Sequence, residues 1–309
     1  MAAIVMQLYS CSNRCIFCNP KGSLTKATDK KLKEVKKASE AQAAELIKEG
    51  IKCVEVSGTD PIEHPEIASF IKNLKKEYGF EYVILSTHGK NMSDPKLVDK
   101  LSEAGLDKVK IPFYGSNARI HDSITQIEGS FDETIKGVEN IIDNTNIDLL
   151  ITSLIMRQNY KDVLNIFSLA SNYAYEVGFA IPCAPESVDF TRFSISFDEI
   201  KPYLLSLLKE ADKDEEVALT IYDIPYCVPG FYDDRIQMTR PPIVGKSYSI
   251  RPEFRTDKPN VPSYRVKRAL DICKRCKCND ICDGFYEKYL ELMGNAQLKS
   301  LKPITEIDQ

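Results

Sequence analysis

The 309-residue sequence lacks any apolar run approaching the roughly 18–20 residues that a membrane-spanning helix needs. Its opening stretch, MAAIVMQLY, has no basic segment and no small-residue cleavage site, which argues against a secretory signal peptide. A net charge of −4 provides no general attraction to nucleic acid or to an anionic membrane surface. We therefore expect a cytoplasmic protein whose partners are neither membranes nor nucleic acids.

The sequence also lacks low-complexity tracts, and its first two-thirds alternates between strand-like and helix-like runs. Helical periodicity is expected around residues 41–48, 67–74, 97–104 and 135–142, and again before the sixth strand. The expected strands cover residues 2–9, 52–57, 82–87, 108–114, 148–155 and 176–181. Six consecutive strand–helix units favour parallel strands joined by connections of one hand, in an open doubly wound sheet or in a barrel.

After Pro185 this pattern loosens. One more helix is expected at residues 197–211 and one more strand at residues 217–224. Residues from about 224 to 263 are then rich in Pro, Arg and Tyr and show little periodicity. A cysteine cluster that runs into a helix follows, and an ordered metal site there would anchor this irregular segment.

Ten cysteines stand out in a chain with no secretory signal. In a reducing compartment, clustered thiols usually indicate metal binding or catalysis and seldom a disulfide framework. Seven of the ten lie in two tight clusters near opposite ends of the chain, whereas Cys53, Cys183 and Cys227 stand alone. This distribution predicts two separate metal sites.

The first cluster lies in the stretch QLYSCSNRCIFCNPKGS, directly after the first expected strand. Cys11, Cys15 and Cys18 follow the spacing Cys-x3-Cys-x2-Cys, and Phe17 precedes the last of them. Cysteine thiolates hold iron–sulfur clusters. A cubane with three protein ligands leaves one iron open to an exogenous molecule, as a catalytic metal site requires.

Polar residues also follow the next three expected strands, in the stretches SGTDPIEHP, STHG and PFYGSNARIHD. In parallel α/β folds, functional groups gather where strands end and loops begin. We therefore expect these loops and the three-cysteine loop to meet at one rim of the sheet.

The loop CSNRCIFC resembles the signature of the radical S-adenosylmethionine (SAM) enzymes, and this resemblance extends from about residue 3 to residue 180. It implies an α/β fold in the form of a partial (β/α)6 barrel. It also implies that the amine and carboxylate of SAM bind the open iron, and that one electron cleaves SAM to a 5′-deoxyadenosyl radical. A one-electron donor such as flavodoxin or ferredoxin and oxygen-free conditions belong to the same expectation.

Shorter stretches resemble the SAM-binding turns of that family. SGTDP resembles the Gly-Gly-Glu-Pro turn, with Gly58 and Pro61 matching and with Asp60 offering a carboxylate one methylene shorter than glutamate. STHG resembles a Thr-Asn-Gly turn, with His88 in the Asn position, and the stretch from Tyr114 resembles the loop after the fourth strand. The resemblance thus implies a SAM site formed by Phe17, Gly58, Thr59, Asp60, Thr87, His88 and Tyr114.

The second cluster reads Cys273-x2-Cys276-x-Cys278-x3-Cys282. Without Cys278 it resembles the auxiliary-cluster extensions called twitch and SPASM domains, in which an upstream cysteine joins the later ones. The resemblance implies a second [4Fe–4S] cluster on Cys227, Cys273, Cys276 and Cys282, closed by four ligands and suited to electron transfer. We expect a radical SAM core over residues 1–215 and an auxiliary domain over residues 216–309.

Simpler interpretations of these residues stay open. Zinc competes with iron–sulfur at both clusters, more seriously at the second, and Cys278 could replace one of its four ligands. Cys53 is expected in the core, and Cys183 is an inert buried thiol or a radical relay. His88 and His121 either contact SAM or substrate or are hydrogen-bonded structural residues.

The expected activity is hydrogen abstraction from a small-molecule, cofactor or nucleoside substrate. No peptide-docking domain precedes the first strand, which favours that interpretation over the alternative, a maturase of ribosomally made peptides. A non-catalytic iron–sulfur electron carrier or redox sensor is the second alternative. A carrier needs neither an open iron nor SAM-binding turns.

Overall fold

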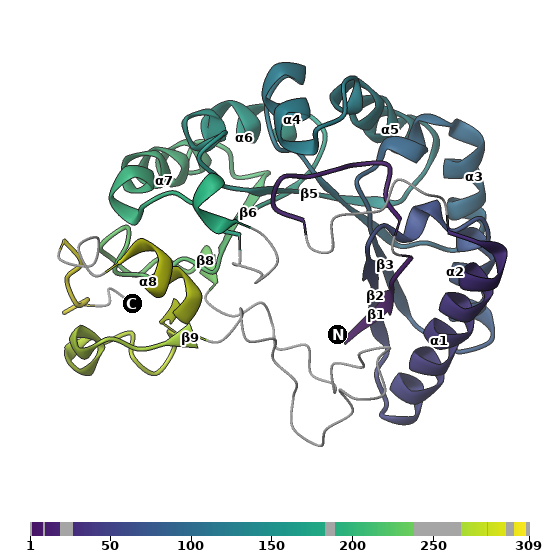
Figure 1. Ribbon diagram of the computed structural model, residues 1–309, viewed down its shortest axis with the longest axis horizontal. Helices are drawn as coiled ribbons and strands as arrows, with labels where there is room; N and C mark the ends of the chain where they lie inside the picture. The colour runs from purple at the N-terminus through teal and green to yellow at the C-terminus, as the bar shows by residue number, and fades with distance from the viewer. Residues whose placement is uncertain are drawn as a thin grey trace. The chain divides into compact units, whose positions relative to one another are not determined.

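The structure, a computed structural model, describes residues 2–8, 10–18, 27–182, 189–237, 267–282, 284–294 and 300–306. The fold is α/β, with a parallel sheet whose eight strands, β1 to β8, follow one another in sequence order (Figure 1). This confirms the α/β class with a parallel sheet, whereas the expected C-terminal auxiliary-cluster domain stays a prediction. By its contacts the chain divides into two units: the first comprises Met1–Pro112 and Asn117–Ile151, and the second comprises Phe113–Ser116, Thr152–Pro242 and Val261–Gln309.

Four parallel strands form the centre of the first unit: β1 (Ala2–Met6), β2 (Cys53–Gly58), β3 (Tyr82–Ser86) and β4 (Lys108–Pro112). Their register places Ile4 opposite Val56 and Leu85 opposite Val109. Every second residue of each strand is buried and apolar, because alternate side chains of a strand point to the same face of the sheet. All four strands were predicted from the sequence.

The helices of this unit are α1 (Asp29–Lys48), α2 (Ile67–Lys76), α3 (Pro95–Glu103), α4 (Ala118–Thr125) and α5 (Ser130–Asn144), with the short 3₁₀ helices η1 (Pro61–Glu63) and η2 (Lys90–Ser93). Helices α1, α2 and α3 lie on one side of strands β1–β3 (Figure 1). The predicted apolar positions of α2 are all buried. Gly105 has a positive φ of 85° directly after α3, which confirms its predicted role at the end of that helix.

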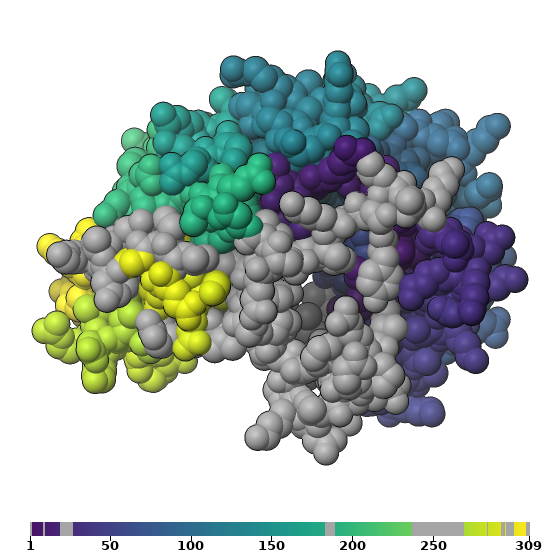
Figure 2. Space-filling model, in the orientation of Figure 1, coloured from purple at the N-terminus to yellow at the C-terminus, as the bar shows by residue number. Residues whose placement is uncertain are grey.

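Helix α1 begins well before the predicted start near Ala41. Thr28 caps it, because its side-chain oxygen accepts a hydrogen bond from the backbone N–H of Lys31 at 3.3 Å. Its charged residues are exposed or partly exposed, and the helix forms part of the purple surface in Figure 2. On the buried face, the Gln42 side chain accepts a hydrogen bond from the backbone N–H of Val5 at 2.9 Å and donates one to the Val5 carbonyl at 3.1 Å. The α1 helix is thereby fixed to β1.

Helix α4 was not predicted. Asn117 caps it, accepting a hydrogen bond from the N–H of Ile120 at 3.2 Å. His121, Ile124 and Thr125 form its buried side. The helix is only eight residues long, so it carries too few apolar positions for a clear helical period.

Strand β5 (Asp148–Leu154) begins in the first unit and ends in the second. The second unit continues with β6 (Glu176–Ala180), β7 (Ala218–Tyr222) and β8 (Ile236–Gln237), and with α6 (Val163–Ser171) and α7 (Phe197–Ala211). Strand β7 pairs in parallel with β6, placing Phe179 opposite Ile221. The boundary expected between residues 215 and 216, just before β7, stays a prediction.

The C-terminal part contains β9 (Lys267–Arg268), β10 (Phe285–Tyr286), the 3₁₀ helix η7 (Asp271–Arg275) and α8 (Glu287–Met293). Two further 3₁₀ helices, η3 (Tyr160–Asp162) and η4 (Phe190–Arg192), lie earlier in the same unit. Strands β9 and β10 pair antiparallel. The α8 helix is the one expected after the cysteine cluster. Among the described helices, none is long and apolar enough to span a membrane.

Candidate functional site

The three-cysteine loop, residues 10–18, follows β1 and is held by α4. The backbone N–H of Arg14 donates to the carbonyl of Thr125 at 2.9 Å, and that of Ile16 donates to the carbonyl of Ile124 at 3.0 Å. These two carbonyls lie in the last turn of α4, where helix carbonyls have no partner within the helix. Cys11, Cys15 and Cys18 are partly exposed and form no disulfide. The loop therefore presents three sulfurs on a backbone that is anchored at two points.

These thiols influence one another electrostatically. Burial raises the pKa of Cys15 far above its usual range, and its neighbours Cys18 and Cys11 raise it further. Burial, followed by Cys11, raises the pKa of Cys18 to about 11. Three thiolates this close repel one another, so without a cation the thiols keep their protons. Binding of a metal would displace those protons. The three cysteine sulfurs are therefore suited to bind a positively charged metal group as thiolates.

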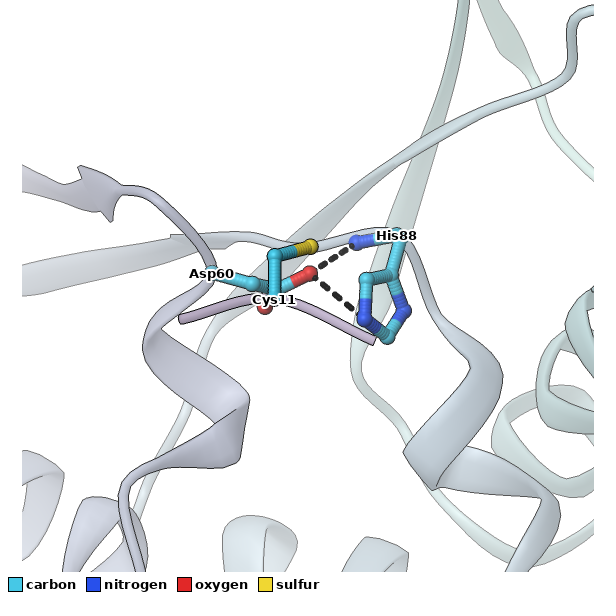
Figure 3. Close-up of side chains that lie close together, drawn as sticks. All are labelled: Cys11, Asp60 and His88. Atoms are coloured by element: carbon cyan, nitrogen blue, oxygen red, sulfur yellow. Dashed lines mark hydrogen bonds and ion pairs between the residues drawn. The ribbon is translucent and has the colours of Figure 1, made fainter. Parts of the chain in front are cut away.

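The spacing of the sulfurs favours a polynuclear group. A single tetrahedral zinc ion with Zn–S bonds of about 2.3 Å would hold its sulfurs within about 4 Å of one another. Among the described His, Cys, Asp and Glu residues, the group whose donor atoms all lie within 4.8 Å of one another is Cys11, Asp60 and His88 (Figure 3). Cys15 and Cys18 are outside that group. The three thiols therefore do not gather around one point as the ligands of a single zinc ion would, and three thiolates are a donor set that iron–sulfur clusters use.

Asp60 joins the loop after β2 to the loop after β3. One carboxylate oxygen caps η1 by accepting a hydrogen bond from the N–H of Ile62 at 3.2 Å. The other accepts a hydrogen bond from the backbone N–H of His88 at 2.8 Å and lies 3.1 Å from the Nε2 atom of the same residue (Figure 3). The Asp60 side chain is only 3% exposed, and its burial raises its pKa. Asp60 is thus a buried link between two loops.

Glu63 joins the three-cysteine loop to the same cluster of side chains. Its Oε1 atom accepts a hydrogen bond from the backbone N–H of Ser12 at 2.6 Å and lies 3.2 Å from Nε2 of His88. Ser12 Oγ lies 3.0 Å from that Nε2 atom. Burial acts to raise the pKa of Glu63, but hydrogen bonds from His88 and Ser12 outweigh it and hold the pKa below its usual value. The expected convergence of the loops after the first three strands is observed.

His88 lies at the centre of this arrangement and is almost fully buried. Burial acts to lower the pKa of His88, whereas the nearby Asp60 carboxylate, Cys11 and Glu63 act to raise it. Its other ring nitrogen, Nδ1, accepts a hydrogen bond from the backbone N–H of Lys90 at 3.2 Å. Thr134 Oγ1 donates to the His88 carbonyl at 3.2 Å, which ties the turn to α5.

The remaining residues assigned to SAM binding are divided between the two units. Gly58 ends β2 with a φ of 148°, and a β-carbon there would overlap the carbonyl group of Met6. Thr87 is buried, and its Oγ1 atom accepts a hydrogen bond from the N–H of Gly89 at 3.2 Å. Phe17 and Thr59 are partly exposed. Tyr114 belongs to the second unit, where its carbonyl accepts a hydrogen bond from Asn159 Nδ2 at 2.9 Å.

Sequence reasoning missed four polar residues of this site. Ser12, Glu63 and Lys90 make the contacts described above, and Lys90 Nζ also lies 3.4 Å from the Ser12 carbonyl. Asn13 is buried, and its Oδ1 atom makes no hydrogen bond within the described part of the chain. The signal for Glu63 was a second carboxylate three residues after Asp60. Ser12, Asn13 and Lys90 had no distinguishing sequence signal.

A second group of thiols lies in the second unit, around one pocket. The pocket is lined by Tyr226, Cys227, Ile272, Cys273, Cys276, Cys278, Asn279, Cys282, Phe285 and Pro303. Burial raises the pKa of Cys227 to about 12, with contributions from Cys282, Cys273 and Cys276. The structure therefore brings together the four cysteines that the sequence grouped. Cys278, which that grouping left out, is fully buried in the same pocket.

The other singled-out residues have ordinary positions. His64 hydrogen-bonds the Leu32 carbonyl and accepts a hydrogen bond from the N–H of Glu66, each at 3.1 Å, so it supports the start of α2. His121 is buried in α4 against the ring of Phe131. Cys53 lies in β2 and is partly exposed. Cys183 lies outside the described residues.

Comparison with known proteins identifies the family. A family model described as the radical SAM superfamily matches residues 8–170. An AdoMet-dependent heme synthase of Methanosarcina barkeri is 25% identical over 181 residues, covering 55% of this chain and 48% of the relative. A GTP 3′,8-cyclase of Petrotoga mobilis is 26% identical over 201 residues, covering 63% of this chain and 60% of the relative. The chain thus spans about half to three-fifths of the length of these relatives.

Solved structures agree on the fold. The crystal structure of Streptococcus suis SuiB bound to S-adenosylmethionine superposes with a TM-score of 0.62 at 12% identity, covering 98% of this chain and 75% of SuiB. At that identity the likeness concerns the fold alone. The family model, in contrast, matches more than half of the sequence and includes all of Cys11, Cys15 and Cys18. The chain belongs to the radical SAM superfamily of enzymes.

Proposed function

We propose that this protein cleaves SAM reductively at a [4Fe–4S] cluster held by Cys11, Cys15 and Cys18. When bound, the cluster supplies one electron to SAM, and the 5′-deoxyadenosyl radical that results takes a hydrogen atom from the substrate. The observation that carries this proposal is the set of three thiols on one anchored loop, the first of which, Cys11, lies beside Asp60 and His88. With three protein sulfurs, one metal position is left to an exogenous ligand.

The chain's own residues position that ligand. Asp60 lies beside Cys11 and Glu63 accepts a hydrogen bond from the neighbouring Ser12, and these two carboxylates favour a cationic group such as the amine of SAM. Both oxygens of Asp60 already accept hydrogen bonds, and its side chain is 3% exposed. The Glu63 side chain is 17% exposed. We assign the amine contact to Glu63 and a loop-linking role to Asp60.

We propose a small-molecule substrate from cofactor or nucleoside biosynthesis. The relatives described above carry the names GTP 3′,8-cyclase and AdoMet-dependent heme synthase, and neither name refers to a peptide. A one-electron donor such as flavodoxin or ferredoxin would reduce the cluster, in the cytoplasm and without oxygen. Substrate-dependent formation of 5′-deoxyadenosine tests the substrate class. A small-molecule fraction of cell extract is expected to stimulate it, and stimulation by the peptide fraction alone would support the maturase alternative.

We further propose a second [4Fe–4S] cluster in a twitch-like C-terminal domain, held by Cys227, Cys273, Cys276 and Cys282. Its support is the common pocket and the mutual effect of these thiols on the pKa of Cys227. Four thiolate ligands would close the site, which suits electron transfer rather than substrate binding. Cys278 is then a buried thiol beside the cluster.

Anaerobic reconstitution with iron and sulfide tests the proposal. The protein should hold about eight iron atoms in two four-iron clusters. Replacing Cys11, Cys15 and Cys18 together with Ala should leave about four irons and abolish reductive SAM cleavage. The matched control, Cys53→Ala, should change neither quantity. Survival of SAM cleavage in the triple variant would refute the site assignment, and an absence of SAM binding at equilibrium would support the electron-carrier alternative.

A further inference from the structure

Strands β2, β3 and β4 carry polar side chains on one face of the sheet. Val56 and Val109 are fully buried on the face that the helices cover (Figure 1). Glu55, Ser86 and Lys110 occupy alternate positions and are partly exposed, so they lie on the opposite face. Parallel sheets usually have apolar residues on both faces, because both are covered. The charged residues therefore indicate that this face has a role other than core packing.

These three side chains form one connected group. The Ser86 hydroxyl donates a hydrogen bond to Oε1 of Glu55 at 2.5 Å, and Lys110 Nζ lies 3.5 Å from the same oxygen. Hydrogen bonds between an ammonium and a carboxylate are usually about 2.7–2.9 Å long, so this ion pair is a loose one. An ammonium has three N–H donors, and Glu55 is the one ion-pair partner of Lys110 among the described residues. The Lys110 ammonium therefore has donors left for a ligand.

The group lies close to the residues around the three-cysteine loop. Ser86 is the last residue of β3 and directly precedes the turn that contains His88. Lys110 is the partner of Ser86 in the parallel register of β3 and β4. The backbone N–H of His88 is in turn bonded to Asp60, in the loop after β2. The group is thus at the end of the strands where α/β proteins bind their ligands.

The described charges on this face of β1–β4 are mostly positive. Lys108 lies two residues before Lys110, so its side chain points to the same face. The two lysines outnumber Glu55, the one carboxylate that these four strands place there. Asp148, at the start of β5, accepts a hydrogen bond at 2.9 Å from the hydroxyl of Tyr82, the first residue of β3. That carboxylate lies at the far end of the strands, so the charge beside the loops is complementary to an anion.

We infer that the Lys110 ammonium binds an anionic group of the substrate, either a carboxylate or a phosphate. Glu55 is then a positioning residue, because it limits rotation of the lysine side chain, and Ser86 fixes Glu55 through its hydrogen bond. The Lys110 side chain is 27% exposed, and this partial burial strengthens its attraction for an anion relative to a fully solvated lysine. The inference rests on the proposed function and specifies the chemical class of its substrate.

The rival interpretation is an ion pair that only stabilises the sheet. In that case Lys110→Met and Glu55→Gln would both change stability, and neither would change the binding of a ligand. An anion site predicts opposite effects of the two variants on binding. Lys110→Met removes the positive charge, whereas Glu55→Gln removes the carboxylate that competes with the ligand and keeps the shape of the side chain.

Isothermal titration calorimetry of the reconstituted, SAM-bound protein tests the inference with two probes, inorganic pyrophosphate and citrate. At least one probe should bind the wild-type protein. Its affinity should fall about tenfold or more in Lys110→Met and should rise in Glu55→Gln. The matched control is Lys72→Met, which should leave the affinity unchanged because Lys72 is exposed on α2, on the helix side of the sheet.

Failure of both probes to bind the wild-type protein, or an affinity that Lys110→Met or Glu55→Gln leaves unchanged, would overturn the inference. If Lys110→Met does not fold, the result for Glu55→Gln decides alone. Absence of iron, sulfide or SAM binding would instead refute the proposed function.

The natural substrate provides a second test. The component of the small-molecule fraction that stimulates formation of 5′-deoxyadenosine should be retained by an anion-exchange resin at neutral pH. Loss of the stimulation after phosphatase treatment would identify the anionic group as a phosphate, and its survival would identify a carboxylate. Stimulation recovered entirely in the unretained fraction would overturn the inference.

Discussion

Gly58 at the end of β2 lies directly against the backbone of Met6 in β1. A β-carbon on Gly58 would be 2.7 Å from the carbonyl carbon of Met6 and would overlap its oxygen. The two residues are partners in the parallel register of β1 and β2. The glycine that the sequence assigned to a SAM-binding turn therefore has a structural requirement of its own, because this close approach positions the strand end that leads to Asp60.

Gly58→Ala should destabilise the protein by about 3–5 kcal/mol, through backbone strain at a φ of 148° and through overlap with Met6. Gly79→Ala is the matched control, because Gly79 has a φ of 74° and a β-carbon there would meet no atom within 4 Å. It should cost about 1–2 kcal/mol. Urea unfolding of both variants measures the difference, and equal losses would show that contact with Met6 is unimportant.

Tyr289 anchors α8 in the second unit. Its hydroxyl donates a hydrogen bond to the Ile195 carbonyl at 2.9 Å, and its ring centroid lies 4.5 Å from that of Phe197. Tyr289→Phe should cost about 1–2 kcal/mol, because the buried Ile195 carbonyl loses its partner while the ring packing is kept. Tyr175→Phe, at a residue 76% exposed, should have almost no effect. Thermal unfolding compares the two, and a Tyr289→Phe protein as stable as the control would contradict the assignment.

His121 should make the stability of the fold depend on pH. Burial in α4, together with His88 and Lys90, lowers its pKa to about 4, whereas Asp122 acts in the opposite direction. Between about pH 6.5 and pH 4 the unfolded chain binds a proton that the folded chain excludes. The free energy of unfolding should therefore fall as the pH falls through this window, by at most about 3 kcal/mol from this residue.

The comparison variant is His121→Gln, which has no titrating group at that position. Urea unfolding at several pH values between 4 and 7.5 gives the two pH profiles. Carboxylates contribute to both, so only the difference between the profiles reports on His121. The variant should show the shallower decline toward pH 4, and parallel profiles would mean that the pKa of His121 is the same in the folded and the unfolded protein.

Single cysteine variants distinguish the ligands in the C-terminal pocket. Cys276→Ala should reduce the iron content from about eight to about four, because it removes a proposed ligand of the second cluster. Cys278→Ala should leave about eight, because Cys278 is proposed as a neighbouring thiol. Iron and sulfide analysis after anaerobic reconstitution measures both. The reverse pattern would exchange the roles of Cys276 and Cys278.

Strands β1 to β7 and most of the α-helices were predictable because their apolar residues repeat with the period of the element, whereas the two-residue strands β8, β9 and β10 were not predicted. The buried positions of α2 are an example, and the predicted bounds of α7 agree with the structure. The start of α1 was missed because its first turns carry mostly charged residues and its Thr28 cap lies far from the apolar positions. Helix α4 was missed because its eight residues depend on contacts with the rest of the first unit.

At the site, the sequence identified the residues that carry strong chemical signals, namely the clustered cysteines, Asp60 and His88. It did not show their contacts. The acceptors around Nε2 of His88 come from three loops that are about 25 to 75 residues apart in the sequence. They meet only when the chain folds. Glu63 and Ser12 acquire their roles through that arrangement. The same limit applies to Cys278, whose burial beside the other thiols is a property of the folded pocket.

The central claim concerns the metal position on the three-cysteine loop that no protein sulfur occupies. Electron paramagnetic resonance of dithionite-reduced, oxygen-free protein before and after addition of SAM tests it most directly. We predict that SAM alters the signal of the cluster on Cys11, Cys15 and Cys18 and leaves the signal of the second cluster unchanged. A spectrum that SAM does not alter, or the presence of zinc without inorganic sulfide on this loop, would contradict the account.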